Sequence, residues 1–197
     1  MGALAFVFSS GWASGLNCYL VVLVLGTADR MHDTEQVPNV LQRWDVLAVA
    51  AVFYAMEFVA DKIPYVDSTW DAVSTAIRPT AGAVVGVLLA GQADSLDGAV
   101  AAVVGGGSAL LSHAVKSGAR LAINSSPEPV SNIGASLTED VAALGVVWFA
   151  IQHPEAAAAI AAVLLAAGLV LLLFLAKLVR RGWRRWKGHD RAPTLAS

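Results

Sequence analysis

Long apolar stretches alternate with short polar connections along most of the chain. A helix needs about 20 mostly apolar residues to cross the hydrocarbon core of a bilayer. Six stretches come near this length, and we expect helices over 3–27, 45–63, 69–90, 99–122, 132–151 and 155–179. The pattern therefore predicts an all-α fold, a polytopic transmembrane helical bundle with about six spans.

Two of the predicted helices contain interruptions. The segment 9–15 is rich in serine and glycine, which weakens the first half of the first helix. Arg78-Pro79 interrupts the third helix, because proline removes one backbone hydrogen bond. Gly82 and Gly86 then share one helix face and allow close approach of a neighbour, either within the chain or in a second copy. We therefore expect broken or kinked helices, and a homo-oligomer is an open alternative.

The composition agrees with a membrane protein. Of the 197 residues, 57% are hydrophobic and 14% are charged, whereas soluble domains average about 45–50% and about 25%. A single cysteine, Cys18, excludes an intramolecular disulfide. The sequence contains no nucleophile elbow, phosphate loop, dinucleotide fingerprint or metal-ligand spacing. We therefore expect no enzymatic activity, no cofactor and no metal site.

Ionisable residues inside the predicted spans are the main functional signal. A charge near the middle of a bilayer costs at least about 2.5 kcal/mol, so it usually faces a partner or a water-filled cavity. Glu57 and Asp61 are four residues apart and share one helix face. His113, Lys116 and Arg120 are spaced three and four apart and form a basic face on another helix. Two such faces would either line a polar pathway, with a buried carboxyl carrying a proton, or only neutralise each other and fix the packing.

Three further ionisable positions are candidates for the same region. Glu139 and Asp140 are adjacent acids about two turns into the fifth helix, and we expect one of them to meet Arg78, Lys116 or His113. Arg78 precedes a helix-breaking proline, which is typical of the midplane sites of transporters and also of a structural ion pair at a kink. His113 fits either a proton relay or a packing role.

These observations place a substrate or ion pathway at the ionisable groups predicted inside the membrane. The pathway candidates are Glu57, Asp61, Arg78, His113, Lys116, Glu139 and Asp140. The secondary candidates are Asn17, Lys62, Asp67, Asp71, Arg120 and Glu128. Two of these, Lys62 and Arg120, are also compatible with plain snorkelling to one membrane surface.

Basic residues gather near the end of the chain. Of 13 lysines and arginines, seven lie in 177–191, interleaved with Trp183 and Trp186. Such a segment is typical of an interfacial anchor rather than of a nucleic-acid site. We therefore divide the chain into a transmembrane bundle over 1–179 and a basic cytoplasmic tail over 180–197. With six spans, both termini would face the cytoplasm, across the inner membrane of a bacterium.

Three motifs carry a resemblance to a known family. They are SGLNCYLVVLVLG at 14–26, EFVADKIPYVDSTWD at 57–71 and KSGARLAINSSPEPVSN at 116–132. In this order they resemble a bacterial integral-membrane family that is catalogued only as a domain of unknown function. The resemblance covers most of 10–155 and implies a common membrane core, but it implies no activity.

The layout of a helix, a charged end, a proline turn and a second helix occurs twice, at 46–90 and at 99–151. This indicates an internal repeat, whose copies run either in the same sense or inverted in a three-plus-three division. We expect a small inner-membrane transporter or channel for a small polar or charged solute or ion, with proton coupling as an option. The alternative is a membrane scaffold or accessory subunit whose intramembrane charges are structural.

Overall fold

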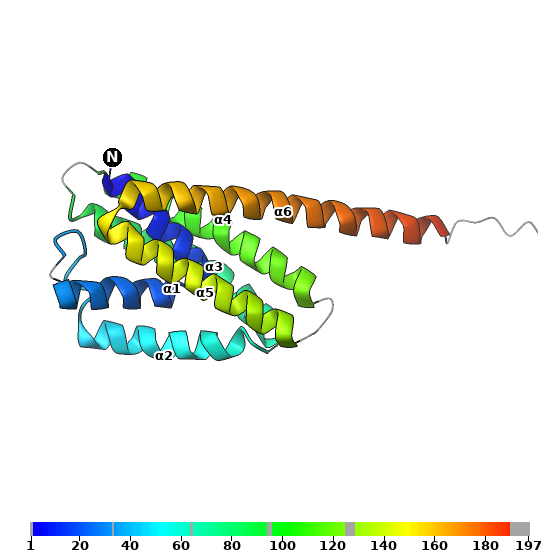
Figure 1. The fold of residues 1–197 in the computed structure, drawn as a ribbon, viewed down its shortest axis with the longest axis horizontal. Helices are drawn as coiled ribbons and strands as arrows, with labels where there is room; N and C mark the ends of the chain where they lie inside the picture. The colour runs from blue at the N-terminus through cyan, green and yellow to red at the C-terminus, as the bar shows by residue number, and fades with distance from the viewer. Residues whose placement is uncertain (1, 33, 64, 94–95, 125–128, 190–197) are drawn as a thin grey trace, which may run out of the picture.

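A computed structural model describes residues 2–32, 34–63, 65–93, 96–124 and 129–189. The described chain folds into helices without strands, as Figure 1 shows. The helices are α1 (Gly2–His32), α2 (Trp44–Ala60), α3 (Val66–Ala90), α4 (Gly98–Asn124), α5 (Pro129–Gln152) and α6 (Pro154–His189). This confirms the predicted all-α, polytopic helical bundle.

Five of these helices are long and apolar enough to cross a membrane, and α2 is the exception. With 17 residues, α2 extends about 26 Å at 1.5 Å per residue, a little less than the hydrocarbon core. It still lies along the bundle beside α1 and exposes apolar side chains outward, among them Val49, Val52 and Met56. The chain is therefore a multi-pass integral membrane protein.

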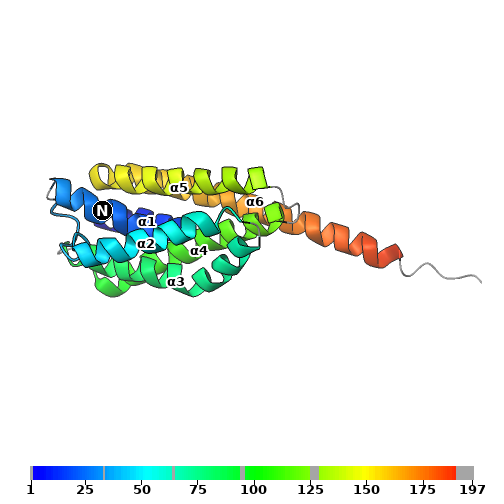
Figure 2. The same cartoon turned by 90° about the horizontal axis from the view of Figure 1, so that it is seen from below.

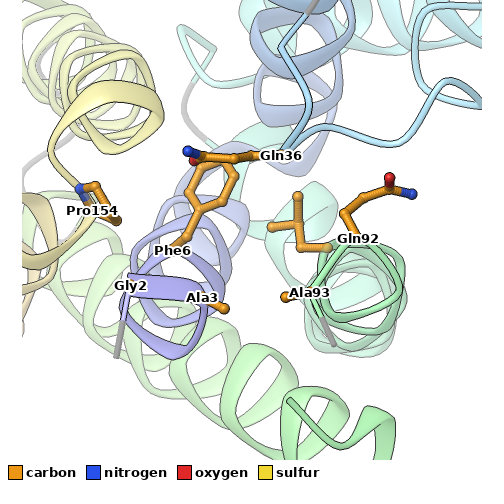
Figure 3. A pocket seen from close by; sticks show the side chains of 8 residues that line it. Gly2, Ala3, Phe6, Gln36, Gln92, Ala93 and Pro154 are labelled. Atoms are coloured by element: carbon orange, nitrogen blue, oxygen red, sulfur yellow. The ribbon is translucent and has the colours of Figure 1, made fainter. Parts of the chain in front are cut away.

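The first helix is broken in its middle. Asn17 has φ −157° and ψ 97°, which is extended backbone between two helical halves. Figure 1 shows that the second half turns back toward the end of the bundle where the chain starts. Phe6 and Gln36 accordingly line one pocket together with Gln92 and Pro154, as Figure 3 shows. The expected break in the first helix is confirmed, and the break reverses the direction of the chain.

This reversal changes the predicted topology of six full crossings, one for each apolar stretch. Helices α2 to α6 each run the length of the bundle in alternating directions, whereas α1 enters and returns (Figures 1 and 2). Gly2 and the C-terminal end of α6 therefore lie at opposite ends of the bundle. The prediction that both termini lie on one side of the membrane requires α1 to cross the bilayer once. That prediction is wrong, because the break at Asn17 turns α1 back to the side on which it starts. Helices α2 and α4 run in the same direction, as the repeat over 46–90 and 99–151 requires.

The third helix differs from its prediction. Every residue from Val66 to Ala90 is helical, so the expected interruption at Arg78-Pro79 does not occur. Proline removes only its own amide donor, and neighbouring helices in a bundle hold the remaining backbone in place. The break that the bundle uses is in α1, where glycine, serine and asparagine meet.

Small residues bring α1, α3 and α4 into close contact. A Cβ at Gly11 would collide with the backbone of Gly105, and one at Gly82 would lie 2.7 Å from the Gly105 carbonyl oxygen. A Cβ at Gly86 would lie 2.5 Å from the carbonyl oxygen of Ala101. The face formed by Gly82 and Gly86 therefore packs within the chain, against α4, as small residues do between membrane helices.

The last helix lies on the outside of the bundle and extends beyond it, as Figures 1 and 2 show. Only 11% of its apolar window is buried. The helix continues past the boundary that we drew at 179 and ends at His189. Residues 190–197 of the predicted tail lie outside the described residues.

Candidate functional site

Charged side chains from four parts of the fold meet inside the bundle. Glu57 lies in the last turn of α2 and Asp61 directly caps it. The others come from α3, α4 and α5. We call this group the buried charge cluster, and its members are Glu57, Asp61, Asp67, Asp71, Arg78, His113, Lys116, Arg120 and Glu139.

Arg78 is the centre of one half of the cluster and is fully buried. Its guanidinium lies 2.8 Å from Glu57 Oε1 and 3.1 Å from Asp71 Oδ1. It also lies 2.7 Å from His113 Nδ1. An arginine can only donate, so Nδ1 accepts and the imidazole is neutral, with its proton on Nε2. That proton is donated to Thr75 Oγ1 at 3.1 Å. His113 is thus fixed in one tautomer beside the ion pairs.

Lys116 is the centre of the other half. Its ammonium lies 2.8 Å from Asp61 Oδ2, 3.5 Å from Glu139 Oε2 and 3.6 Å from Glu57 Oε1. It also donates to the backbone carbonyl of Leu16 at 3.0 Å. Four oxygens from three helices and the α2 cap therefore converge on one buried cation, which links the two halves of the cluster through Glu57.

Arg120 lies at the end of the cluster nearest the turn after α2. Its guanidinium donates to both carboxylate oxygens of Glu139, at 3.2 and 2.7 Å. It also donates to Asn132 Oδ1 at 2.8 Å and to the Asp61 carbonyl at 3.1 Å. Arg120 is 1% exposed, so the snorkelling interpretation is wrong for this residue, because each of its three guanidinium nitrogens has a partner inside the protein.

The break in α1 contributes backbone groups to the cluster. The Leu16 carbonyl accepts from Lys116, and the Gly15 carbonyl accepts from Arg78 at 3.4 Å. Asn17 Oδ1 accepts from the Leu20 amide at 3.0 Å, so Asn17 caps the second half of the helix. The C-terminal end of the first half carries partial negative charge. Cationic side chains therefore satisfy the carbonyls that the break releases.

These carbonyls were missed by sequence reasoning, which considered side chains only. The signal in the sequence was Asn17 within an apolar run that follows a serine- and glycine-rich segment. Asn132 was missed in the same way, because nothing in the sequence marked it as a partner of Arg120. Side-chain amides and freed carbonyls become recognisable as ligands only once the helices are placed.

The remaining sequence candidates lie around the cluster. Asp140 accepts from Asn17 Nδ2 at 3.2 Å, next to the break. Lys62 is only partly buried; its ammonium donates to the Phe58 carbonyl at 2.7 Å and lies 3.0 Å from the Phe58 ring centroid. Asp67 and Asp71, which we ranked as secondary, are fully integrated members of the cluster. Glu128 lies outside the described residues.

Carboxylates outnumber bases in the cluster. Five carboxylates, those of Glu57, Asp61, Asp67, Asp71 and Glu139, face the three bases Arg78, Lys116 and Arg120. Asp140 and Lys62, which lie beside the cluster, have opposite charges, so including both leaves the excess of two carboxylates unchanged. Asp61, Asp67 and Asp71 each offer an oxygen, and these oxygens lie within 4.8 Å of one another. They come from two segments, so no spacing in the sequence predicted them as a set of cation ligands.

Comparison with known proteins gives the family but no activity. No curated protein and no solved structure matches the sequence. One family model, described as a domain of unknown function (DUF4126), matches residues 4–174 and includes every described member of the buried charge cluster. The match extends over most of the chain and confirms the resemblance carried by the three motifs. The chain belongs to the DUF4126 family.

Proposed function

We propose that the protein is a small transporter of the bacterial inner membrane that moves a small polar or charged solute through the buried charge cluster. The observation that carries the proposal is the broken helix α1, whose freed carbonyls contact Lys116 and Arg78 inside a membrane bundle. Discontinuous helices with charged or carbonyl groups at the break are the usual construction of transporter binding sites.

The energetics of the cluster support this proposal. Buried charges in a membrane protein are expensive, and they are typical of ion and solute pathways. A structural ion pair needs only two partners, whereas this cluster joins three bases to five carboxylates. Changing the charge of one member, by a proton or an ion, would therefore alter several contacts at once, including those that hold the two halves of α1.

The broken helix is the element that we propose to move. Lys116 connects the Leu16 carbonyl to Asp61, and Arg78 connects the Gly15 region to Glu57. When an ion or proton neutralises one of these carboxylates, its base loses a partner and the end of the first half-helix is released. Such coupling between a charge and a bistable element is how ion gradients drive conformational change.

Basic residues support an orientation. The end of α6 carries Lys177, Arg180 and Arg181, and it lies at the end of the bundle where α2 and α4 end (Figures 1 and 2). Lys62 directly follows α2, and Arg120 lies near the C-terminal end of α4. By the positive-inside rule we propose that this end faces the cytoplasm. Because α1 returns to its own side, Gly2 then faces outward. Labelling of single cysteines introduced at Gln36 and at Lys177 in intact cells, on a Cys18→Ala background, tests this orientation.

Transport is tested by uptake into liposomes that contain the purified protein. Inorganic ions and small metabolites are screened with and without a pH gradient, and flux is compared among the wild type, Glu57→Gln and Asp45→Asn. Asp45 is exposed at the opposite end of α2, so it is a matched control. We expect flux in the wild type and the control and a loss of at least tenfold in Glu57→Gln. Equal flux in all three would remove the proposed pathway.

The alternative is a membrane scaffold or accessory subunit. Lys116 and Arg120 have several protein partners each, as in a network that only fixes helix packing. This alternative expects no flux for any solute and a stoichiometric partner that co-purifies with the wild type. Neither proposal requires catalytic chemistry at the cluster.

A further inference from the structure

We propose that Asp61, Asp67 and Asp71 bind one divalent cation at the end of the buried charge cluster that we assign to the cytoplasmic side. This proposal deepens the proposed function. Only the role of the ion, as the coupling ion or as the transported solute, rests on the transport proposal. The binding itself would occur equally in a scaffold. Carboxylate oxygens are the ligands that magnesium, calcium and manganese prefer in proteins.

The geometry fits an ion of calcium size. The three acids are buried, and their ligand oxygens lie within 4.8 Å of one another. Oxygens on opposite sides of a bound calcium are separated by about 4.6–5.2 Å, twice the usual metal–ligand distance. Oxygens this close together can thus be shared by one calcium-sized ion after small side-chain adjustments.

Asp61 and Asp71 each have one carboxylate oxygen that does not pair with a base of the cluster. Asp61 Oδ2 pairs with Lys116 at 2.8 Å and lies 3.8 Å from Arg120, but Asp61 Oδ1 has no hydrogen-bond partner in the described chain. Asp71 Oδ1 pairs with Arg78 at 3.1 Å, but Asp71 Oδ2 has none there. These residues are 2% and 3% exposed. A buried carboxylate oxygen without a partner is costly, and a bound cation removes that cost.

The charge of the cluster points to a divalent ion. Its carboxylates exceed its bases by two among the described residues. Two uncompensated negative charges in a low-dielectric interior attract a counter-charge of the same size. Arg120 does not cancel this excess, because its shortest contacts are with Glu139 and Asn132 and it lies 3.8 Å from Asp67 Oδ2.

A cavity gives the ion a route to the site. It measures about 180 Å³ and lies between α3 and α4. Its polar lining consists of Asp71, Arg120 and the hydroxyl-bearing residues Ser68, Thr75 and Ser117. The hydroxyl oxygens can complete the coordination shell or hold its water molecules. The cavity thus lies between α3 and α4 and reaches Asp71.

Titration calorimetry of the full-length protein in nanodiscs tests the proposal. Calcium, manganese and magnesium chlorides are titrated against the wild type, Asp71→Asn and Asp45→Asn, with sodium chloride as the monovalent control. We expect one divalent ion per chain in the wild type and in Asp45→Asn, and affinity at least tenfold weaker in Asp71→Asn. Absence of divalent binding, binding of sodium alone, or unchanged affinity in Asp71→Asn would overturn the proposal.

A second measurement covers the case in which Asp71→Asn does not fold. On a Cys18→Ala background, a spin label is attached at Ser117→Cys beside the cavity or at Gln36→Cys at the other end of the bundle. Bound manganese should broaden the spectrum of the first label and not that of the second. Equal effects on both labels would overturn the site. Cation binding without solute flux would support the cation site and contradict the transport proposal. Solute flux without cation binding would support transport and contradict the cation site.

Discussion

Helices α1 and α6 are both long and apolar enough to cross a membrane, yet they have opposite places in the bundle. In α1, 78% of the apolar window is buried, whereas in α6 the share is 11%. The difference lies in side-chain size and polarity. The first half of α1 carries serine and glycine and ends at Asn17, while α6 carries mainly alanine, leucine and valine up to Lys177. Glycine and polar side chains favour contact with other membrane helices, whereas the apolar side chains of α6 are equally stable in lipid.

The contrast extends to charge. The basic residues near the end of α6 are exposed, as Arg180 and Arg181 illustrate, but the bases that contact α1 are among the most buried groups of the protein. The same residue type therefore has two functions in one chain. On α6 it fits the role of an interfacial anchor, and beside α1 it satisfies carbonyls and carboxylates that have no access to water. Substitutions in the two regions can test this difference.

The largest effect is expected from removal of a base beside α1. Arg78→Ala leaves Glu57 and Asp71 buried without their guanidinium partner, and we expect a loss of about 3–5 kcal/mol of stability. Arg180→Ala on α6 should change stability by less than about 0.5 kcal/mol, as surface substitutions do. Chemical denaturation in detergent measures both. Similar stabilities for the two variants would contradict the contrast between the helices.

A smaller loss is expected where α1 packs against α4. A Cβ at Gly15 would meet the backbone of Ala109, with the Ala109 carbonyl carbon at 2.9 Å. We expect Gly15→Ala to cost about 1–3 kcal/mol through overpacking. The matched change is Gly107→Ala on α4, where nothing lies within 4 Å of the new Cβ. That variant should gain up to about 1 kcal/mol from helix propensity. Melting temperatures that fall equally in both would show that α1 does not pack as described.

The cap at the break should contribute less again. Asn17→Ala removes the acceptor of the Leu20 amide and the donor to Asp140, and we expect a loss of about 0.5–2 kcal/mol. Asn17→Asp retains the acceptor but places a second carboxylate beside Asp140. It should therefore be no more stable than Asn17→Ala, and a clearly stabilised Asn17→Asp would contradict the contact between Asn17 and Asp140. Denaturation curves of the three proteins measure the difference.

The smallest effect is expected on the outer face of α6. Leu173 is 63% exposed within the bundle, so Leu173→Ala replaces one lipid-facing apolar group by a smaller one. We expect a change within about 0.5 kcal/mol. An equivalent truncation at Leu25, which is fully buried in α1, should cost about 2–5 kcal/mol. Loss of stability in Leu173→Ala comparable to that in Leu25→Ala would indicate that a partner covers α6.

Much of the helical framework was predictable because hydropathy and helix-breaking residues act locally. The spans over 99–122 and 155–179 fall inside α4 and α6, and the weak first half of the first helix contains the residues that lead into the break. The topology was not predictable from the same signals, because a break can either bend a helix or reverse it. Which outcome occurs depends on packing against elements far along the chain, such as those that line one pocket with Phe6 and Gln36.

The candidate site was predictable only in part. Periodicity placed Glu57 and Asp61 on one face and Lys116 and Arg120 on another, because a helix repeats every 3.6 residues. It could not show that Asp67 and Asp71 lie beside Asp61, since that requires the turn after α2 to fold α3 back against it. Nor could it show the carbonyls of Gly15 and Leu16 as ligands, because every residue has a carbonyl and only a break in a helix releases one.

The sequence by itself determined that this protein is a membrane bundle with charges it must bury, since apolar length and the cost of intramembrane charge are properties of short segments. Only the tertiary structure decided which charges meet, which helix lies at the centre and where the chain turns back. Those outcomes depend on packing between segments far apart in the sequence. The contact of Asn17 with Asp140, for example, joins residues that are 123 positions apart.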